Sequence, residues 1–253
     1  MDVKAWVSET APEPVARVLR SAYYAVFPAT SPEQIRVDWK ATIPDYDRYA
    51  GELTAHPAYD GIVETLEALS NGGAIGRDAM QDLYVLVRTQ RPDVVVETGV
   101  CNGASTFAML AALEENGRGE LHSIDYPFHS SVPMARRREE TFPGIGQAEI
   151  PADREPGWLV PADLRDRWTF YEGKSQEVLP GVLRDHPPDL FVHDSEHSHP
   201  AMMFELEAAW HAMDAGAIVC DDITWNDAFD VFTEVRADSF DRMSENRGYV
   251  EVT

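Results

Sequence analysis

The stretch from Asp93 to Ser105 constrains the fold more than any other part of this chain. It reads Asp-Val-Val-Val-Glu-Thr-Gly-Val-Cys-Asn-Gly-Ala-Ser, an apolar β-branched run that ends in an acid and leads into a turn with two glycines. A helical pattern follows from Thr106 to Glu115. A buried strand, a tight turn and a helix form the opening unit of a nucleotide-binding α/β sheet. The free N–H groups at the start of such a helix face any ligand that lies there.

The spacing of the two glycines narrows the kind of ligand. The turn has the pattern E-x-G-x-x-x-G, made by Glu97, Gly99 and Gly103, and not the G-x-G-x-x-G of dinucleotide-binding proteins. A ligand with an amino-acid end needs a carboxylate for its amine and a donor for its own carboxylate, which Glu97 and Ser105 can supply. S-adenosylmethionine (SAM) is such a ligand. An ordinary parallel strand with a glycine turn is the alternative.

Strand patterns alternate with helix patterns through the rest of the chain. Strands are expected at 94–97, 120–125, 168–171, 189–194 and 217–221. This alternation predicts an α/β fold, a Rossmann-like doubly wound, mostly parallel sheet with helices on both faces.

The first part of the chain has a different pattern. Residues 1–74 are expected to form an N-terminal helical extension, with helices at 15–26 and 62–69, and residues 75–253 the main domain. A lid, a dimer surface and part of a substrate pocket are open alternatives for the extension. The long segment 126–160, rich in proline, glycine and charge, is a candidate for a mobile lid.

Every predicted strand ends at an acid. The carboxyl ends of parallel strands share one edge of a sheet, so these acids repel one another unless a cation lies among them: Glu97, Asp125, Glu172, Asp194 and Asp221–Asp222. Asp194, Asp221 and Asp222 together offer the oxygen ligands that Mg²⁺ prefers. Alternatively, Asp221 and Asp222 cap the following helix and Asp194 is merely solvated.

The segment from His193 to His199 contains three histidines. His193 to His197 matches H-x-x-E-H, a zinc peptidase signature that requires a helix. Here it follows a strand, and Pro200 is expected to begin the next helix. In an extended chain the first and last residues of the motif lie about 13 Å apart, too far to share one zinc ion.

His197 is instead the candidate catalytic base. It lies three residues past Asp194 at the reactive edge of the sheet, and imidazole can take a proton from a hydroxyl near neutral pH. Glu196 is the competing base. His122 and His211 are assigned as ordinary surface or core histidines.

The charge of the chain excludes some partners. It carries 44 acidic and 21 basic residues, a net charge of −23, and only three lysines. Such a surface repels nucleic acid and anionic membranes. It is also suited to concentrated salt, which predicts a halophilic source, with an acidic mesophilic enzyme as the alternative. Without a membrane-length apolar run or a signal peptide, the chain is expected to have no membrane span and to be soluble and cytoplasmic.

With these motifs the chain resembles class I SAM-dependent methyltransferases over about residues 75–226. Within that class it looks like the metal-dependent O-methyltransferases, which include catechol-type and macrolide-sugar enzymes. The resemblance implies that Glu97 binds the SAM amine and Ser105 the methionine carboxylate, in a motif with Gly99 and Gly103. It further implies roles at the cofactor for Asp125 at the ribose, for Gly173, Ser175 and Gln176 at the adenine, and for Asp194.

The resemblance also implies a metal triad and an acceptor. Asp194, Asp221 and Asp222 match the Mg²⁺ ligands, and His197 falls where the sugar enzymes carry a histidine and the catechol enzymes a lysine. The expected function is therefore transfer of a methyl group from SAM to a hydroxyl of a sugar, glycan or small molecule. A catechol or phenol acceptor, a catalytically inactive SAM-binding domain and a partner-binding domain are the alternatives. A homo-oligomer is also left open.

Overall fold

The computed structural model describes residues 35–36, 39–69, 75–127, 150–237 and 239–253. Contacts divide the chain into two units, Met1–Ile35 and Arg36–Thr253. The short strand β1 (Ile35–Arg36) lies at the boundary between them. The helix expected at 15–26 and residues 128–149 of the expected lid lie outside the described residues. The features below all belong to the second unit.

Short helices lead into the sheet. These are α3 (Trp39–Thr42), α4 (Tyr46–Thr54) and α5 (Tyr59–Ala68), and the last of them is the helix expected at 62–69. The amphipathic helix α6 (Arg77–Gln90) follows, and α4 packs against it. The role of residues 1–74 as a lid or dimer surface stays a prediction.

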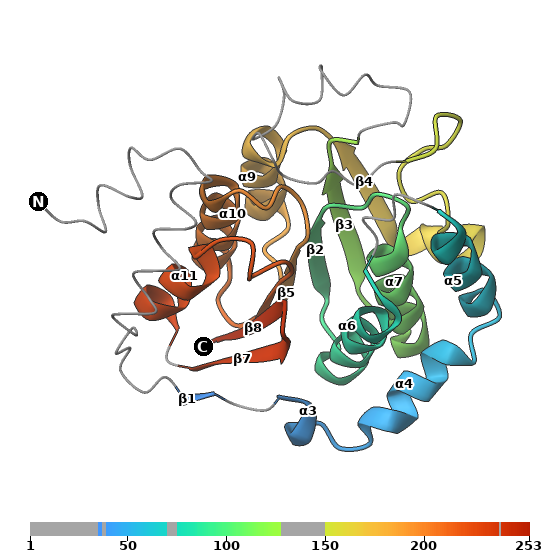
Figure 1. Cartoon of the computed structure of the whole chain (residues 1–253), viewed down its shortest axis with the longest axis horizontal. Coiled ribbons are helices and arrows are strands. Elements are labelled where there is room, and N and C mark those ends of the chain that lie inside the picture. The colour runs from blue at the N-terminus through green and yellow to red at the C-terminus, as the bar shows by residue number, and fades with distance from the viewer. Residues whose placement is uncertain (1–34, 37–38, 70–74, 128–149, 238) are drawn as a thin grey trace, which may run out of the picture. The chain divides into compact units, whose positions relative to one another are not determined.

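The five predicted strands form a parallel sheet. They are β2 (Val94–Thr98), β3 (Glu120–Asp125), β4 (Trp168–Glu172), β5 (Leu190–His193) and β6 (Gly216–Cys220). Their neighbours pair in parallel, β2 with β3 and β5, β3 with β4, and β5 with β6. The predicted doubly wound, mostly parallel α/β fold is thereby confirmed (Figure 1).

A C-terminal hairpin extends the sheet beyond β6. The strands β7 (Ser239–Ser244) and β8 (Arg247–Val252) are antiparallel, and β8 pairs antiparallel with β6. From β7 onward, the order across the sheet is therefore β7-β8-β6-β5-β2-β3-β4. The sequence pattern after Ile223 was too weak to predict this hairpin.

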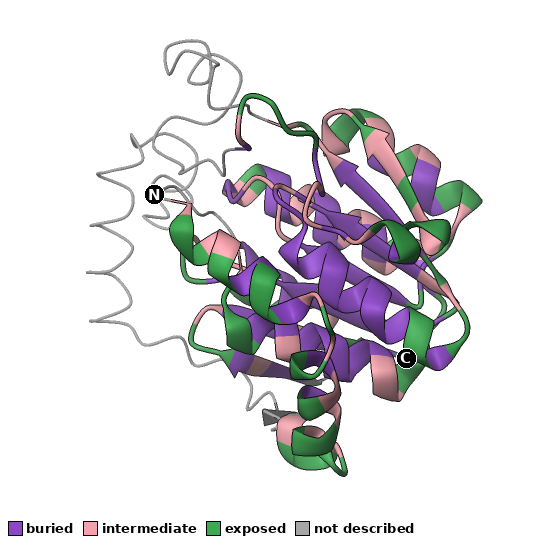
Figure 2. Ribbon diagram, turned by 90° about the vertical axis from the view of Figure 1, so that its right-hand side faces the viewer, coloured by how far each residue is buried: buried purple, intermediate pink, exposed green. Residues whose placement is uncertain are grey.

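Helices cover both faces of the sheet. Neighbouring residues of a strand point to opposite sides, so the apolar side chains on each face pack against a different set of helices. Val95 packs with α6 and α7 (Ala104–Asn116), whereas Val96 packs with residues of α9 (Ser175–Asp185), α10 (His199–Ala212) and α11 (Ala228–Arg236). The two sets of helices lie on opposite faces in Figure 1, and the strands between them are buried in Figure 2. The 3₁₀-helix η1 (Ala162–Arg167) precedes β4.

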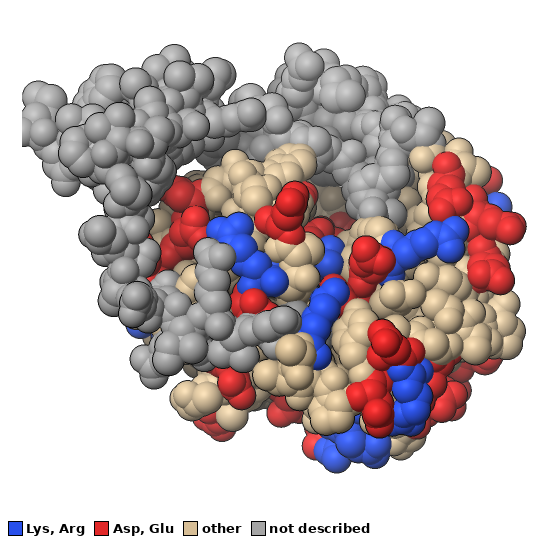
Figure 3. Space-filling model, turned by 60° about the horizontal axis from the view of Figure 1, so that its bottom comes forward, with Lys and Arg blue, Asp and Glu red and all other residues tan. Residues whose placement is uncertain are grey.

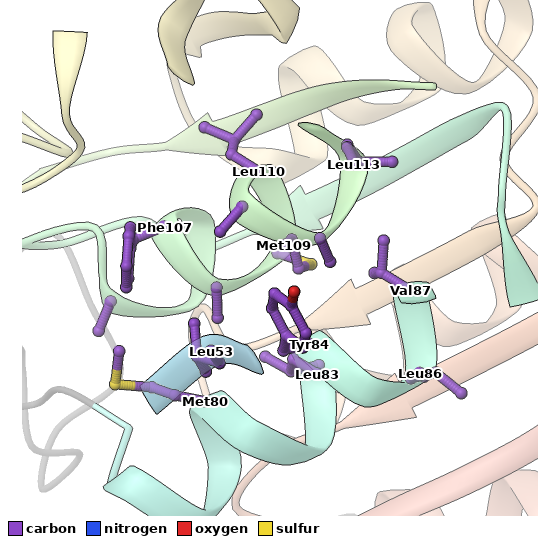
Figure 4. Close-up of a cluster of buried hydrophobic side chains, with 14 of the residues drawn as sticks. Leu53, Met80, Leu83, Tyr84, Leu86, Val87, Phe107, Met109, Leu110 and Leu113 are labelled. Atoms are coloured by element: carbon purple, nitrogen blue, oxygen red, sulfur yellow. The ribbon is translucent and has the colours of Figure 1, made fainter. Parts of the chain in front are cut away.

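The first of the two cores joins α4, α6 and α7. Leu53 of α4 lies among Met80, Leu83 and Tyr84 of α6, and Phe107 of α7 borders the same cluster (Figure 4). All five side chains are almost completely inaccessible to solvent. This packing fixes the helix that follows the glycine turn. Among the described residues, no helix has both the length and the apolar character needed to cross a membrane.

The strand order identifies where a ligand can bind. From β2 the chain proceeds to β3 and β4 on one side, and later to β5 and β6 on the other. In such sheets ligands bind at the carboxyl ends of the strands where the direction of winding reverses, here between β2 and β5. The turn after β2 and the loop after β5 flank this point.

Candidate active site

The turn after β2 and the loop after β5 meet at Gly99. This residue has φ +88°, and a Cβ atom placed there would lie 1.9 Å from the carbonyl oxygen of Asp194. The backbone N–H of Asp194 in turn donates to the carbonyl of Thr98 at 2.9 Å. Only glycine permits this approach, which places Asp194 beside the glycine turn at the reversal point of the sheet.

Gly103 is required by a contact within the protein. It caps α7 with φ +94°, and a Cβ atom there would lie 2.8 Å from the Cα atom of Gly157. The N–H of Gly157 donates to the carbonyl of Cys101 at 2.9 Å, and Trp158 Nε1 donates to Asn102 Oδ1 at 2.7 Å. The segment that contains Gly157 and Trp158 thus packs against the turn.

Glu97 is completely buried at the end of β2 and holds three hydroxyl groups. Ser105 donates to its Oε1, while Thr106 at 2.8 Å and Ser123 at 2.7 Å donate to its Oε2. Burial raises the pKa of Glu97 to about 7, although these hydrogen bonds oppose the shift. The two residues expected at the amino-acid end of SAM therefore contact each other directly.

Asp125 ends β3 and holds the same turn from the other side. Its Oδ2 accepts hydrogen bonds from the N–H groups of Cys101 at 2.8 Å and Val100 at 3.2 Å. Burial raises its pKa, and the backbone donors oppose the shift. The N–H of Gly173 donates to the carbonyl of Asp125 at 2.9 Å. The residues expected at the ribose and at the adenine thus lie next to each other.

The rest of the expected adenine segment begins α9. Ser175 is the first residue of that helix and is partly buried, while Gln176 is exposed. The sequence pattern did not indicate α9, because Pro180 inside it argues against a helix.

His197 lies between two of the expected metal ligands. Its Nε2 is 3.6 Å from Asp194 Oδ1, and its Nδ1 is 3.5 Å from Asp222 Oδ2. Burial acts to lower the pKa of His197, but these carboxylates together with Asp221 raise it. Burial also raises the pKa of Asp194 to about 6, against the opposing effect of His197. The structure therefore brings the expected base and the expected acids into one cluster.

Two residues of the C-terminal hairpin, which the sequence did not predict as site residues, contact this cluster. Arg247 Nη2 lies 3.0 Å from Asp221 Oδ1, and Arg247 Nη1 lies 3.8 Å from Asp82 Oδ2. Asn246 donates to Asp222, which has a left-handed φ of 53°. No local pattern marks these residues, since they reach the site through the pairing of β8 with β6.

The three aspartates have the right chemistry for a cation but are spread apart. Within the described ranges, Asp194, Asp221 and Asp222 do not each place one oxygen within 4.8 Å of the other two. The three carboxylates repel one another, and they pair instead with the positive side chains of Arg247 and His197. Asp221 Oδ1 is buried and faces the guanidinium of Arg247 at 3.0 Å in the part of the chain described. A cation bound here would therefore share this carboxylate with Arg247.

A second buried acid, Glu205, holds the loop after β5 in place. Glu205 of α10 accepts from Thr98 at 2.6 Å and Ser195 at 2.7 Å, and His193 Nδ1 lies 2.6 Å from the same carboxylate. His193 itself is completely buried, as expected for a structural histidine. The sequence reasoning missed Glu205. The available signal was its place beside Leu206 on the apolar face of a helix, where an acid needs a buried partner.

Residues from the loops after β5 and β6 surround His197. Glu196, the competing base, accepts a hydrogen bond from Ser198, which caps α10. Trp225 is 43% exposed, and its ring lies 5.4 Å from that of His197. Asn226 donates to the carbonyl of His197 at 3.0 Å and anchors the loop. An aromatic side chain therefore lies beside the candidate base with one part open to solvent.

Solved structures share this fold. An O-methyltransferase from Bacillus cereus in complex with SAH is 15% identical, with a TM-score of 0.54 over 84% of this chain and 99% of that one. TomG from Streptomyces achromogenes is 16% identical, with a TM-score of 0.55 over 83% of this chain and 99% of that one. The O-methyltransferase NovP is 17% identical, with a TM-score of 0.56 over 83% of this chain and 100% of its own.

The family assignment rests on a sequence model. Curated proteins give no match. The model of a methyltransferase-domain family matches residues 96–223, slightly more than half of the 253-residue chain, and spans β2 to the loop after β6. The match and the fold confirm the enzyme class expected from the sequence, a class I SAM-dependent methyltransferase. The chain belongs to this methyltransferase-domain family.

Proposed function

We propose that this protein transfers the methyl group of SAM to a hydroxyl oxygen. The observation that carries the proposal is His197, which lies between Asp194 and Asp222 at the reversal point of the sheet, next to the glycine turn after β2. An imidazole at that place can accept a hydroxyl proton within reach of a cofactor held by the turn. TomG was solved with SAM and the Bacillus cereus enzyme with SAH, and both are described as O-methyltransferases.

The cofactor is proposed to lie over the carboxyl ends of β2 and β3. Asp125 is placed for the ribose hydroxyls, and Gly173 with Ser175 borders the adenine. Glu97 is proposed to act on the amine through its charge, since its oxygens are occupied by the hydroxyls of Ser105, Thr106 and Ser123. Because burial disfavours the ionised form of Glu97, an ammonium group nearby would favour release of its proton.

The acceptor is proposed to bind beside His197 and Trp225, whose rings lie 5.4 Å apart and contact each other. His197 removes the proton of the acceptor hydroxyl, and the resulting oxygen attacks the sulfonium methyl in line, so that SAM leaves as its demethylated product. Holding both reactants in one geometry supplies much of the rate. The exposed face of Trp225 offers an apolar platform for a ring. A sugar or glycan is the proposed acceptor, and a catechol or phenol is the second candidate.

Mg²⁺ is proposed to bind at Asp194, Asp221 and Asp222. Their donor chemistry fits this hard cation, and the proposal is supported by the clustering of Asp194 and Asp222 around His197 at the end of the sheet where the strands finish. When bound, the ion would stabilise negative charge on the acceptor oxygen. The carboxylates would have to approach one another, and Arg247 would then share Asp221 with the ion.

Asp222→Ala is expected to reduce methyl transfer and to remove its response to Mg²⁺. The substitution deletes one of three proposed ligands and the charge that faces His197 Nδ1. Turnover is measured with Mg²⁺ and with chelator, and Asp230→Asn is the control, since Asp230 is an exposed acid that pairs with Arg242. Activity of the wild type in chelator equal to that in Mg²⁺ would contradict the metal site.

A halophilic source is proposed from the charge of the chain. The net charge is −23, and basic side chains lie beside acidic ones on the face shown in Figure 3. Salt screens the repulsion among the unpaired acids, so the melting temperature is expected to rise between dilute buffer and molar KCl. Equal stability and solubility in both would contradict this proposal. The cytoplasmic location, the absence of a nucleic-acid partner and a homo-oligomeric state stay predictions from the sequence.

A further inference from the structure

A second cluster of polar side chains lies at the opposite edge of the sheet from the candidate active site. Glu120 and His122 belong to the amino end of β3, whereas the active-site acid Asp125 ends the same strand. His186 directly follows the last residue of α9. Two elements that are distant in the sequence therefore bring two imidazoles and one carboxylate together.

The three side chains have the spacing of a metal site. Each places one ligand atom within 4.8 Å of the other two, and within the described ranges these residues are the group that does so. His122 Nε2 lies 3.0 Å and His186 Nδ1 lies 3.6 Å from Glu120 Oε1. Ligands at about 2.0–2.1 Å from a tetrahedral zinc ion are about 3.3 Å apart, close to these two separations.

The surrounding contacts orient the ligands. His122 is 2% exposed, and its Nδ1 lies 3.2 Å from the hydroxyl of Tyr171. When Nδ1 carries the hydrogen and donates it to that hydroxyl, Nε2 keeps its lone pair toward Glu120. Histidines that bind metals are commonly held by this kind of outer hydrogen bond. The rings of His122 and His186 stack at 3.9 Å with an angle of 27°, so the ring of His186 would turn out of the stack to direct its lone pair at an ion shared with His122.

We propose that Glu120, His122 and His186 bind a divalent transition metal ion, with Zn²⁺ as the preferred ion and water as the fourth ligand. Two imidazole nitrogens favour zinc over magnesium, whereas the all-oxygen aspartate cluster favours magnesium. The charge of the site also suits a cation. Glu120 supplies one negative charge, and the charge of the neighbouring Asp185 is balanced by Arg184 at 2.9 Å. The ion would link β3 to the end of α9, and its role would be to stabilise the fold.

The test is calorimetric titration of Zn²⁺ into the folded protein in buffer that contains saturating Mg²⁺. His186→Gln is the first variant, since His186 is partly exposed at a helix end. His211→Gln is the matched control, because His211 also lies near a glutamate, 3.5 Å from Glu207, but is not grouped with a second histidine among the residues that the structure describes. The wild type and His211→Gln are expected to bind one more equivalent of Zn²⁺ than His186→Gln, and to gain more thermal stability from it.

Two further variants keep the proposal testable if His186→Gln perturbs the fold. Glu120→Gln, at an exposed position, is expected to lose the same equivalent, and Tyr171→Phe is expected to weaken Zn²⁺ binding by about 10–100-fold. Circular dichroism verifies that each variant is folded. The proposal would be overturned if folded His186→Gln and Glu120→Gln bound Zn²⁺ with unchanged stoichiometry and affinity. It would also be overturned if the wild type, with saturating Mg²⁺ present, bound no Zn²⁺.

Discussion

Gly99→Ala is expected to lower the free energy of unfolding by about 2–6 kcal/mol, from about 1–3 kcal/mol of backbone strain and a similar cost of overlap. The residue has φ +88°, and its new methyl group would lie 1.9 Å from the carbonyl oxygen of Asp194. A backbone carbonyl cannot rotate away as a side chain can. The turn after β2 and the loop after β5 would have to separate at the cofactor edge. Both chemical denaturation and SAM binding are expected to report the change.

Gly117→Ala is the matched control for this substitution. Gly117 also has a positive φ, +66°, at the end of α7, but a Cβ atom there meets nothing within 4 Å. Its cost is expected to be about 1 kcal/mol, from the left-handed backbone alone. Equal losses of stability in the two variants would show that the contact with Asp194 contributes nothing, and would contradict the account of this turn.

His197→Ala is expected to reduce turnover by about 10²–10⁴-fold while the affinity for SAM stays nearly unchanged. Loss of the imidazole removes the proposed proton acceptor. It does not touch Glu97 or Asp125, the acids proposed at the cofactor. The two effects are separated by measuring kcat with a methyl acceptor and Kd for SAM by calorimetry.

His199→Ala is the control for that experiment. His199 lies two residues further along, is 41% exposed in its side chain and pairs with Asp227 at 2.8 Å. Its removal is expected to leave most of the turnover. Full activity of His197→Ala, or equal losses in the two variants, would contradict the role of His197 as the base.

The sequence was sufficient to predict the central strands but not the end of the sheet. The run from Val94 to Glu97 is apolar, β-branched and bounded by a glycine turn, so its local pattern alone marks a buried parallel strand. The β7–β8 hairpin contains Asp241, Arg242 and Arg247 among its apolar residues. Its stability depends on pairing with β6, which no local pattern reveals.

The candidate site shows the same division between local and distant contacts. Asp194 directly follows β5 and Asp222 is the second residue after β6, so the position of each could be predicted from its own segment. Arg247 pairs with Asp221 across 26 positions of sequence, a contact that only the folded sheet creates. The contact between Ser105 and Glu97 was also missed, because the expectation assigned both side chains to a ligand and not to each other.

The most direct test of the central claim is calorimetric titration of SAM and of its demethylated product into the protein in high KCl, with Mg²⁺ and with chelator. The account predicts micromolar binding of both ligands at one site per chain, followed by Mg²⁺-dependent transfer to a sugar or phenol hydroxyl. A demonstrably folded sample that binds neither ligand would contradict the assignment as a SAM-dependent O-methyltransferase. The acidic edge of the sheet would then be a metal site of another kind.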